Sequence, residues 1–188
     1  MKEIVKAFKH LARDIMIYIL PGFTLLAYVL FIFNYQFNMF EKDEILSSKN
    51  LLIILIGSYI IGHIILGFME LFVYSKVDKL FFKKERRVLE EATNNKIDAE
   101  LEILAYSKRK AYDFFVERHT QLSLFRWNLS GAFLIISILS FLFIINNYNC
   151  NLLIIGIFSF IIFLILFIFS IRTELDGLNR RKVLAAKK

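Results

Sequence analysis

Residues 51–73 read LLIILIGSYIIGHIILGFMELFV, an apolar run that is long enough to cross a bilayer as one helix. At about 100° per residue, five of its residues share one helix face within an arc of roughly 80°; this polar stripe consists of Tyr59, His63, Gly67, Glu70 and Tyr74. A histidine or a glutamate that faces lipid costs several kcal/mol. We therefore expect the polar stripe to face protein or water.

Three further apolar runs flank this one, so that candidate membrane helices cover 15–33, 51–73, 129–145 and 152–171. A helix of roughly 20 apolar residues spans a bilayer, and a soluble chain of 188 residues does not need four such runs. The sequence predicts an all-α integral membrane protein, in contact with lipid, whose four transmembrane helices form two hairpins.

Basic residues are concentrated in three segments, 1–14, 74–128 and 172–188, which hold 22 of the 24 lysines and arginines. Cytoplasmic segments of membrane proteins carry this excess. We therefore expect both termini and the central segment to be cytoplasmic, with short external loops at 34–50 and 146–151. The net charge of +7 follows from this topology and needs no nucleic-acid partner.

The central segment 74–128 separates an N-terminal unit, 1–73, from a second hairpin, 129–171, and a basic tail, 172–188. It lacks proline and glycine, and residues that favour turns stand at 93–95. It should form a cytoplasmic helical hairpin with a coiled-coil-like apolar seam. Its basic clusters are a candidate surface for a cytosolic protein or for a nucleotide or oligonucleotide ligand: Lys83, Lys84, Arg86, Arg87, Lys108, Arg109 and Lys110.

Residues with catalytic or metal-binding chemistry are sparse in this chain. The three histidines fall in separate segments and Cys150 is the one cysteine. No spacing typical of a metal site, a phosphate-binding loop or a nucleophilic elbow occurs. We expect neither enzymatic activity nor a cofactor.

The first apolar run also has a polar face, formed by Asp14, Tyr18 and Tyr28. In an antiparallel hairpin with residues 51–73, Asp14 should lie near Glu70, and His63 should lie between the two tyrosines. Cationic side chains at the inner ends of the other two helices are the expected counter-ions of the two carboxylates; they are Arg126 and Arg172.

Three interpretations of the polar stripe remain open: buried contacts within one bundle, the lining of a water-filled path, and a proton relay through His63 and Glu70. In the second, Leu52 and Ile56 continue the same face as an apolar constriction. Pro21-Gly22 is either a kink or a gating hinge. Small residues suited to close helix contacts also occur: Ser58, Gly62, Ser130, Ser137 and Ser140.

With Leu20-Pro21-Gly22-Phe23 in the first helix and a helical insert after the second, this layout resembles the small four-helix membrane proteins of bacterial antiphage operons, such as the membrane component of the Kiwa system. The resemblance implies a protein of the bacterial inner membrane that oligomerises and responds to a cytosolic partner or ligand. We expect a homo-oligomer, of four subunits, that acts as a regulated channel or pore in antiviral defence. The alternative is a non-conducting scaffold or sensor that recruits a cytosolic protein.

Overall fold

The computed structural model describes residues 11–37, 48–83, 118–146 and 149–185, and every one of these residues except Asn149 is helical. Four helices in this part of the chain are long and apolar enough to cross a membrane, namely Leu11–Ile32, Asn50–Phe82, Thr120–Ile145 and Cys150–Gly177. The expected all-helical architecture with four candidate membrane helices is confirmed.

The first helix contains a π-helical segment, η1 (Ile15–Ile19), followed by α2 (Leu20–Phe37). Pro21 is the second residue after η1, following Leu20, and is buried. A proline has no N–H to donate, so α-helical pairing would leave the carbonyl of Ile17 without its donor four residues later. Widening to π-helix is one of the adjustments by which a membrane helix accommodates a proline.

The second helix runs without a break from Ser48 to Phe82. It consists of α4 (Ser48–Phe68), η2 (Met69–Tyr74), α5 (Ser75–Val77) and η3 (Asp78–Phe82), of which η2 and η3 are π-helical. Its residues from Tyr74 onward belong to the segment expected to carry the helix into the cytoplasm, and the helix does continue as far as the structure describes it.

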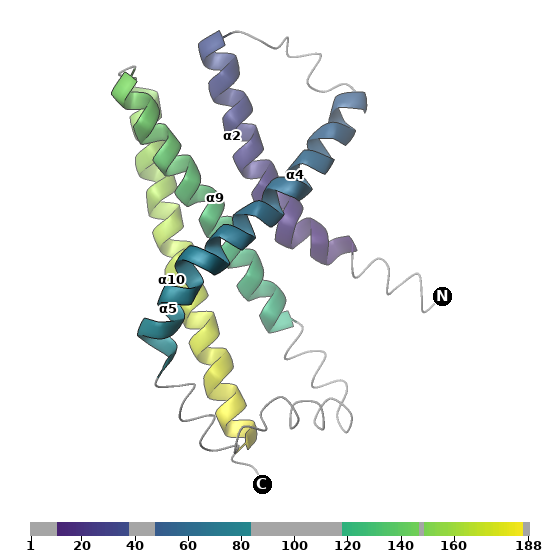
Figure 1. Cartoon of the computed structure of the whole chain (residues 1–188), viewed down its shortest axis with the longest axis vertical. Helices are drawn as coiled ribbons and strands as arrows, with labels where there is room; N and C mark the ends of the chain where they lie inside the picture. The colour runs from purple at the N-terminus through teal and green to yellow at the C-terminus, as the bar shows by residue number, and fades with distance from the viewer. Residues whose placement is uncertain (1–10, 38–47, 84–117, 147–148, 186–188) are drawn as a thin grey trace.

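The last two helices, α9 (Arg118–Asn146) and α10 (Cys150–Ala185), form an antiparallel hairpin and pack along each other more extensively than any other pair (Figure 1). α4 crosses this hairpin obliquely in Figure 1, and α2 and α4 diverge from their crossing toward the ends that face their connecting segment. The first pair is therefore a crossing pair and not a close parallel-sided hairpin.

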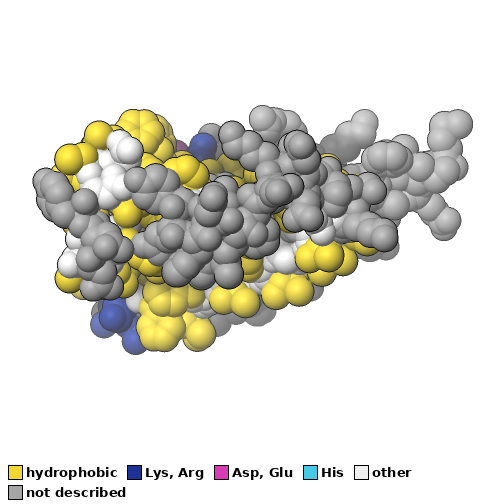
Figure 2. All heavy atoms as spheres, turned by 90° about the horizontal axis from the view of Figure 1, so that it is seen from above, with side chains coloured by type: hydrophobic (Ala, Val, Ile, Leu, Met, Phe, Trp, Pro, Cys, Tyr) yellow, Lys and Arg dark blue, Asp and Glu magenta, His cyan; other side chains and the backbone are white. Residues whose placement is uncertain are grey.

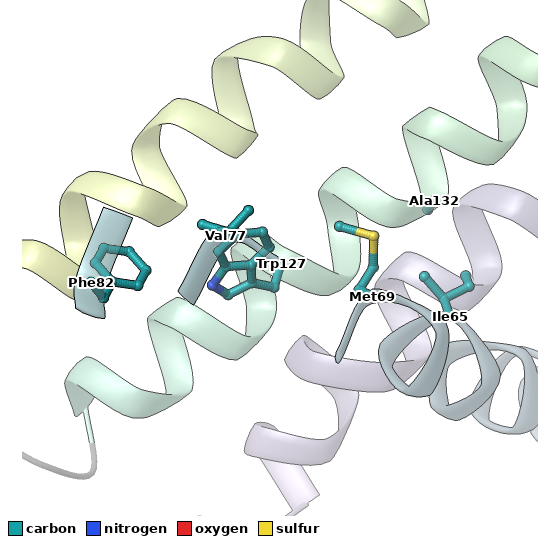
Figure 3. Packing of buried hydrophobic residues seen from close by; sticks show 6 residues of the cluster. All are labelled: Ile65, Met69, Val77, Phe82, Trp127 and Ala132. Carbon is teal, nitrogen blue, oxygen red and sulfur yellow. The ribbon is translucent and has the colours of Figure 1, made fainter. Parts of the chain in front are cut away.

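The main core lies where the C-terminal half of the second helix packs on α9 and α10 (Figure 3). Its buried members are Ile65, Met69, Val77, Phe82, Trp127 and Ala132. A second cluster links α2 to the opposite end of the α9–α10 hairpin and consists of Tyr28, Ile32, Ile136 and Leu152.

Much of the outer surface is apolar, and hydrophobic side chains make up most of the coloured atoms in the view of Figure 2. Only 17% of the most apolar stretch of the second helix, and the same share of α10, is buried inside the protomer. Soluble monomers rarely expose large contiguous apolar patches. The composition of the surface therefore fits a multi-pass membrane protein.

Several expectations fall on residues outside the described ranges. These are the turn at 93–95, the apolar seam of the cytoplasmic hairpin and most of its basic clusters: Lys84, Arg86, Arg87, Lys108, Arg109 and Lys110. Lys83, at the end of the described part of the second helix, is exposed.

Candidate functional site

Most of the polar stripe points away from the bundle of its own protomer. Tyr59, His63 and Glu70 are exposed, although buried contacts within one bundle were one interpretation of the sequence. The structure does not bury these three side chains, although the His63 ring contacts Tyr18 of η1. The buried face of the same helix is formed by small and apolar residues instead, among them Ser58 and Gly62.

His63 lies at the centre of an aromatic cluster between α4 and η1. The ring of Tyr18 stacks on its imidazole with 3.7 Å between centroids and 12° between planes, and the ring of Tyr59 lies 4.4 Å away. Nδ1 of His63 lies 3.0 Å from the carbonyl oxygen of Tyr59. Because a carbonyl only accepts, Nδ1 must carry the proton and donate it. Nε2 of the neutral ring is then an acceptor.

Tyr28 takes a different direction from the one expected. Its hydroxyl is hydrogen-bonded to the hydroxyl of Ser140 on α9, and its ring is buried in the second core cluster. His63 therefore has Tyr18 beside it as expected, but it does not lie between Tyr18 and Tyr28. α2 crosses α4 and then diverges from it (Figure 1). Tyr28, which lies beyond the crossing, therefore contacts α9 and not α4.

The C-terminal end of the polar stripe also differs from the expected arrangement. Tyr74 packs edge-on against Trp127 of α9, with centroids 5.6 Å apart. Tyr74 is the last residue of the π-helical segment η2, which begins after His63. A π-helix has more residues in each turn than an α-helix. The side chain of Tyr74 therefore does not point in the direction that α-helical spacing from His63 predicts. Gly67, just before η2, has open space where a side chain would begin.

The expected ion pairs between helices do not form within the described part of the chain. Asp14 pairs with its neighbour Arg13 at 3.2 Å. Arg126 donates to the hydroxyl of Thr173 and lies 5.8 Å from the ring centroid of Phe169. Both partners of Arg126 are on α10, because the α9–α10 hairpin holds its side chain away from α4.

Arg172 is exposed on α10, and neither it nor Arg126 pairs with Asp14 or Glu70 among the residues that the structure describes. Glu70 is thus an exposed carboxylate without a described counter-ion. Such a carboxylate in a membrane helix needs water or a partner from outside the described residues.

The crossing of the first two helices is the tightest helix contact. A Cβ at Gly22 would lie 1.8 Å from the carbonyl oxygen of Ser58, and a Cβ at Gly62 would lie 2.1 Å from that of Tyr18. Only glycine permits so close an approach of two backbones. The close contact expected for Ser58 and Gly62 is confirmed, and Pro21-Gly22 forms a packed kink with both residues buried.

Asn128 of α9 joins this crossing to the second hairpin. Its side-chain nitrogen donates to the carbonyl oxygens of Ile17 at 2.6 Å and of Gly62 at 3.0 Å. The carbonyl of Ile17 is the one that Pro21 cannot pair in α-helical geometry. Sequence reasoning assigned no role to Asn128. The predicted third membrane helix begins at 129, so Asn128 falls at the end of the central segment. An amide directly beside a predicted membrane helix was the available signal, because polar side chains within membrane helices commonly hydrogen-bond across helices.

Serines fill the contact between α9 and the helices beside it. Ser137 donates to the carbonyl oxygen of Gly156 on α10 at 3.0 Å, while Ser130 bonds back to Trp127 in its own helix. Both serines are fully buried, as is Ser140. The expected small polar contact between helices is confirmed for Ser137 and for Ser140, which is hydrogen-bonded to Tyr28 of α2, whereas the hydrogen bond of Ser130 stays within α9.

Comparisons with known proteins identify no relative: the chain matches no protein-family model, no curated protein and no solved structure. Among the described residues, no group of three or more histidine, cysteine, aspartate or glutamate side chains could hold a metal ion within one protomer. The candidate site is therefore defined by the geometry of the polar stripe itself.

Proposed function

We propose that this protein is a homo-oligomeric membrane protein in which the polar stripes of neighbouring copies face one another and line a regulated ion path. The observation that carries the proposal is the exposure of Tyr59, His63 and Glu70 on the outside of the protomer. A histidine and a carboxylate on a membrane helix need a neighbour other than lipid. Among the described residues of the same copy, Tyr18 and Tyr59 contact the His63 ring, yet both His63 and Glu70 remain exposed and Glu70 forms no ion pair.

The second helix has two different exposed faces, which supports this assignment. Ile53, Ile60 and Ile64 are more than half exposed and lie roughly 60° to 100° around the helix from His63. This apolar face suits lipid. The polar stripe lies between it and η1, so that a neighbouring copy can cover the stripe while the isoleucines stay in lipid.

The external half of the same path is apolar. Leu52 and Ile56 continue the polar stripe and are 61% and 53% exposed. A ring of such side chains in an oligomer forms a hydrophobic constriction, which closes a path by excluding water. We propose that this constriction holds the resting state closed and that the cytoplasmic helices release it.

The biological setting follows from the resemblance to membrane proteins of antiphage operons. We propose that the protein resides in the bacterial inner membrane with both termini in the cytoplasm, and that it acts as an effector in antiviral defence. The segment 74–128, with 12 basic residues, would receive the cytosolic signal, either a partner protein or a nucleotide or oligonucleotide ligand.

Ion flux into liposomes that contain the purified full-length protein tests the path. Ile56→Ser should increase leak by wetting the constriction, whereas the matched control Ile64→Ser, equally apolar and also exposed, should not. His63→Leu and Glu70→Leu should abolish signal-dependent flux or toxicity without loss of membrane insertion.

Equal leak from Ile56→Ser and Ile64→Ser would show that the stripe lines no path. If neither the wild type nor Ile56→Ser conducts while crosslinking still finds oligomers, the protein is instead a non-conducting scaffold that recruits a cytosolic partner. Toxicity in cells then depends on that partner and not on Ile56.

A further inference from the structure

His63 is held in one orientation and one tautomer by its own protomer. Tyr18 stacks on the ring, and Tyr59 contributes both a ring contact and the carbonyl that accepts the Nδ1 proton. The side chain is nevertheless exposed. Nε2, which carries the lone pair, has no partner among the described residues.

Histidines that bind a metal ion share this feature. A ligating histidine almost always donates its other ring N–H to a carbonyl, a carboxylate or a water, which fixes the tautomer and increases the basicity of the ligating nitrogen. Imidazole nitrogen suits zinc and the neighbouring first-row transition metals. His63 has this supporting contact already in place, at 3.0 Å.

The described residues of one protomer do not complete such a site, since they offer no cluster of three possible ligands. In a rotationally symmetric assembly, copies inserted in the same orientation place equivalent residues at the same depth. The polar stripes that face one another would therefore bring the Nε2 atoms of His63 from neighbouring copies to one level on the axis.

We infer that His63 residues from two or more copies bind a divalent transition-metal ion such as zinc through their Nε2 atoms. The inference rests on the proposed association of the polar stripes, but it does not require that the assembly conduct ions. A metal ion at this level ties the copies together across the middle of the membrane. It also replaces the lipid contact that an unpaired histidine would otherwise have to make.

Zinc binding to the purified full-length protein, in detergent and in phospholipid vesicles, tests the inference by equilibrium dialysis. Wild type should bind less than one zinc ion per chain. Loss of the hydrogen-bond partner of a ligating histidine weakens metal binding by roughly 10- to 100-fold. His63→Gln removes the ligand itself and should weaken zinc binding by at least that factor. The double variant His10→Gln/His119→Gln is the matched control and should bind as the wild type does, because those histidines lie in other segments.

Two further measurements test the metal site and the association of the copies independently. Tyr18→Leu, which removes the stacking ring but no ligand, should weaken zinc binding less than His63→Gln does. Oxidative crosslinking of Ile56→Cys in a Cys150→Ser background, without metal, reports whether the stripes meet.

Crosslinking without His63-dependent zinc binding would overturn the metal site alone. No crosslinking would overturn both the site and the proposed assembly. Binding of one zinc ion per chain to a monomer would refute a shared site.

Discussion

Replacement of Gly62 by alanine tests the crossing of the first two helices. The new Cβ would lie 2.1 Å from the carbonyl oxygen of Tyr18, and 2.7 Å and 2.8 Å from its C and Cα atoms. A carbon and a carbonyl oxygen approach no closer than about 3.3 Å even in close helix contacts. The two backbones must therefore separate by about 1.2 Å, and no side-chain rotation can relieve the overlap, since the atoms of Tyr18 are backbone atoms.

The expected cost has two parts. Overpacking of a close contact costs about 1–3 kcal/mol. Separation of the helices also breaks at least one of the two hydrogen bonds from Asn128, which bridges Ile17 and Gly62, at about 0.5–1.5 kcal/mol. We expect Gly62→Ala to lower the free energy of unfolding by about 1.5–4.5 kcal/mol.

Gly67→Ala is the matched control, because it changes the same residue type in the same helix at a position where a Cβ meets no atom within 4 Å. Alanine favours helix over glycine by about 1 kcal/mol, so this variant should be as stable as the wild type or more so. Unfolding by sodium dodecyl sulfate can be followed through the fluorescence of Trp127, the one tryptophan, which is buried. Equal unfolding midpoints for the two alanine variants would refute the crossing.

Three further outcomes test other contacts. A double-mutant cycle of Tyr28→Phe and Ser140→Ala should give a coupling of about 0.6 kcal/mol, typical of hydrogen bonds between membrane helices, and zero coupling would separate the two hydroxyls. Arg126→Gln should destabilise the protein by about 1 kcal/mol or more, through loss of a charged hydrogen bond to α10, while the exposed Arg172→Gln should cost nothing measurable; equal effects would contradict the described contacts. A cysteine at Asn95 in a cysteine-free background should react with a membrane-impermeant reagent only after cells are opened, and labelling of intact cells would reverse the proposed topology.

The sequence by itself determined the number and approximate extent of the apolar helices, because about 20 apolar residues are the length that a helix needs to cross a bilayer. It also determined that Tyr59 and His63, which both lie in α4, share a face, since residues four apart in an α-helix lie one above the other. The same periodicity placed Ser58 next to Gly62 on a face suited to close contact.

Only the tertiary structure decided which face of each helix meets a neighbour. Periodicity relates residues within one helix, whereas the partner of a face depends on the crossing angle and on the rotation of two helices. The crossing at Gly22 and Gly62 turns Tyr28 toward Ser140, and the π-helical η2 turns Tyr74 toward Trp127.

Long-range pairing also decided the role of Asn128. Its amide lies 111 residues from Ile17 and 66 from Gly62 along the chain, yet it donates to the carbonyl oxygens of both. No local pattern indicates which carbonyls an amide will reach. The same packing leaves His63 and Glu70 outside the bundle, because Ser58, Gly62 and Ile65 occupy the face that α2 and α9 cover.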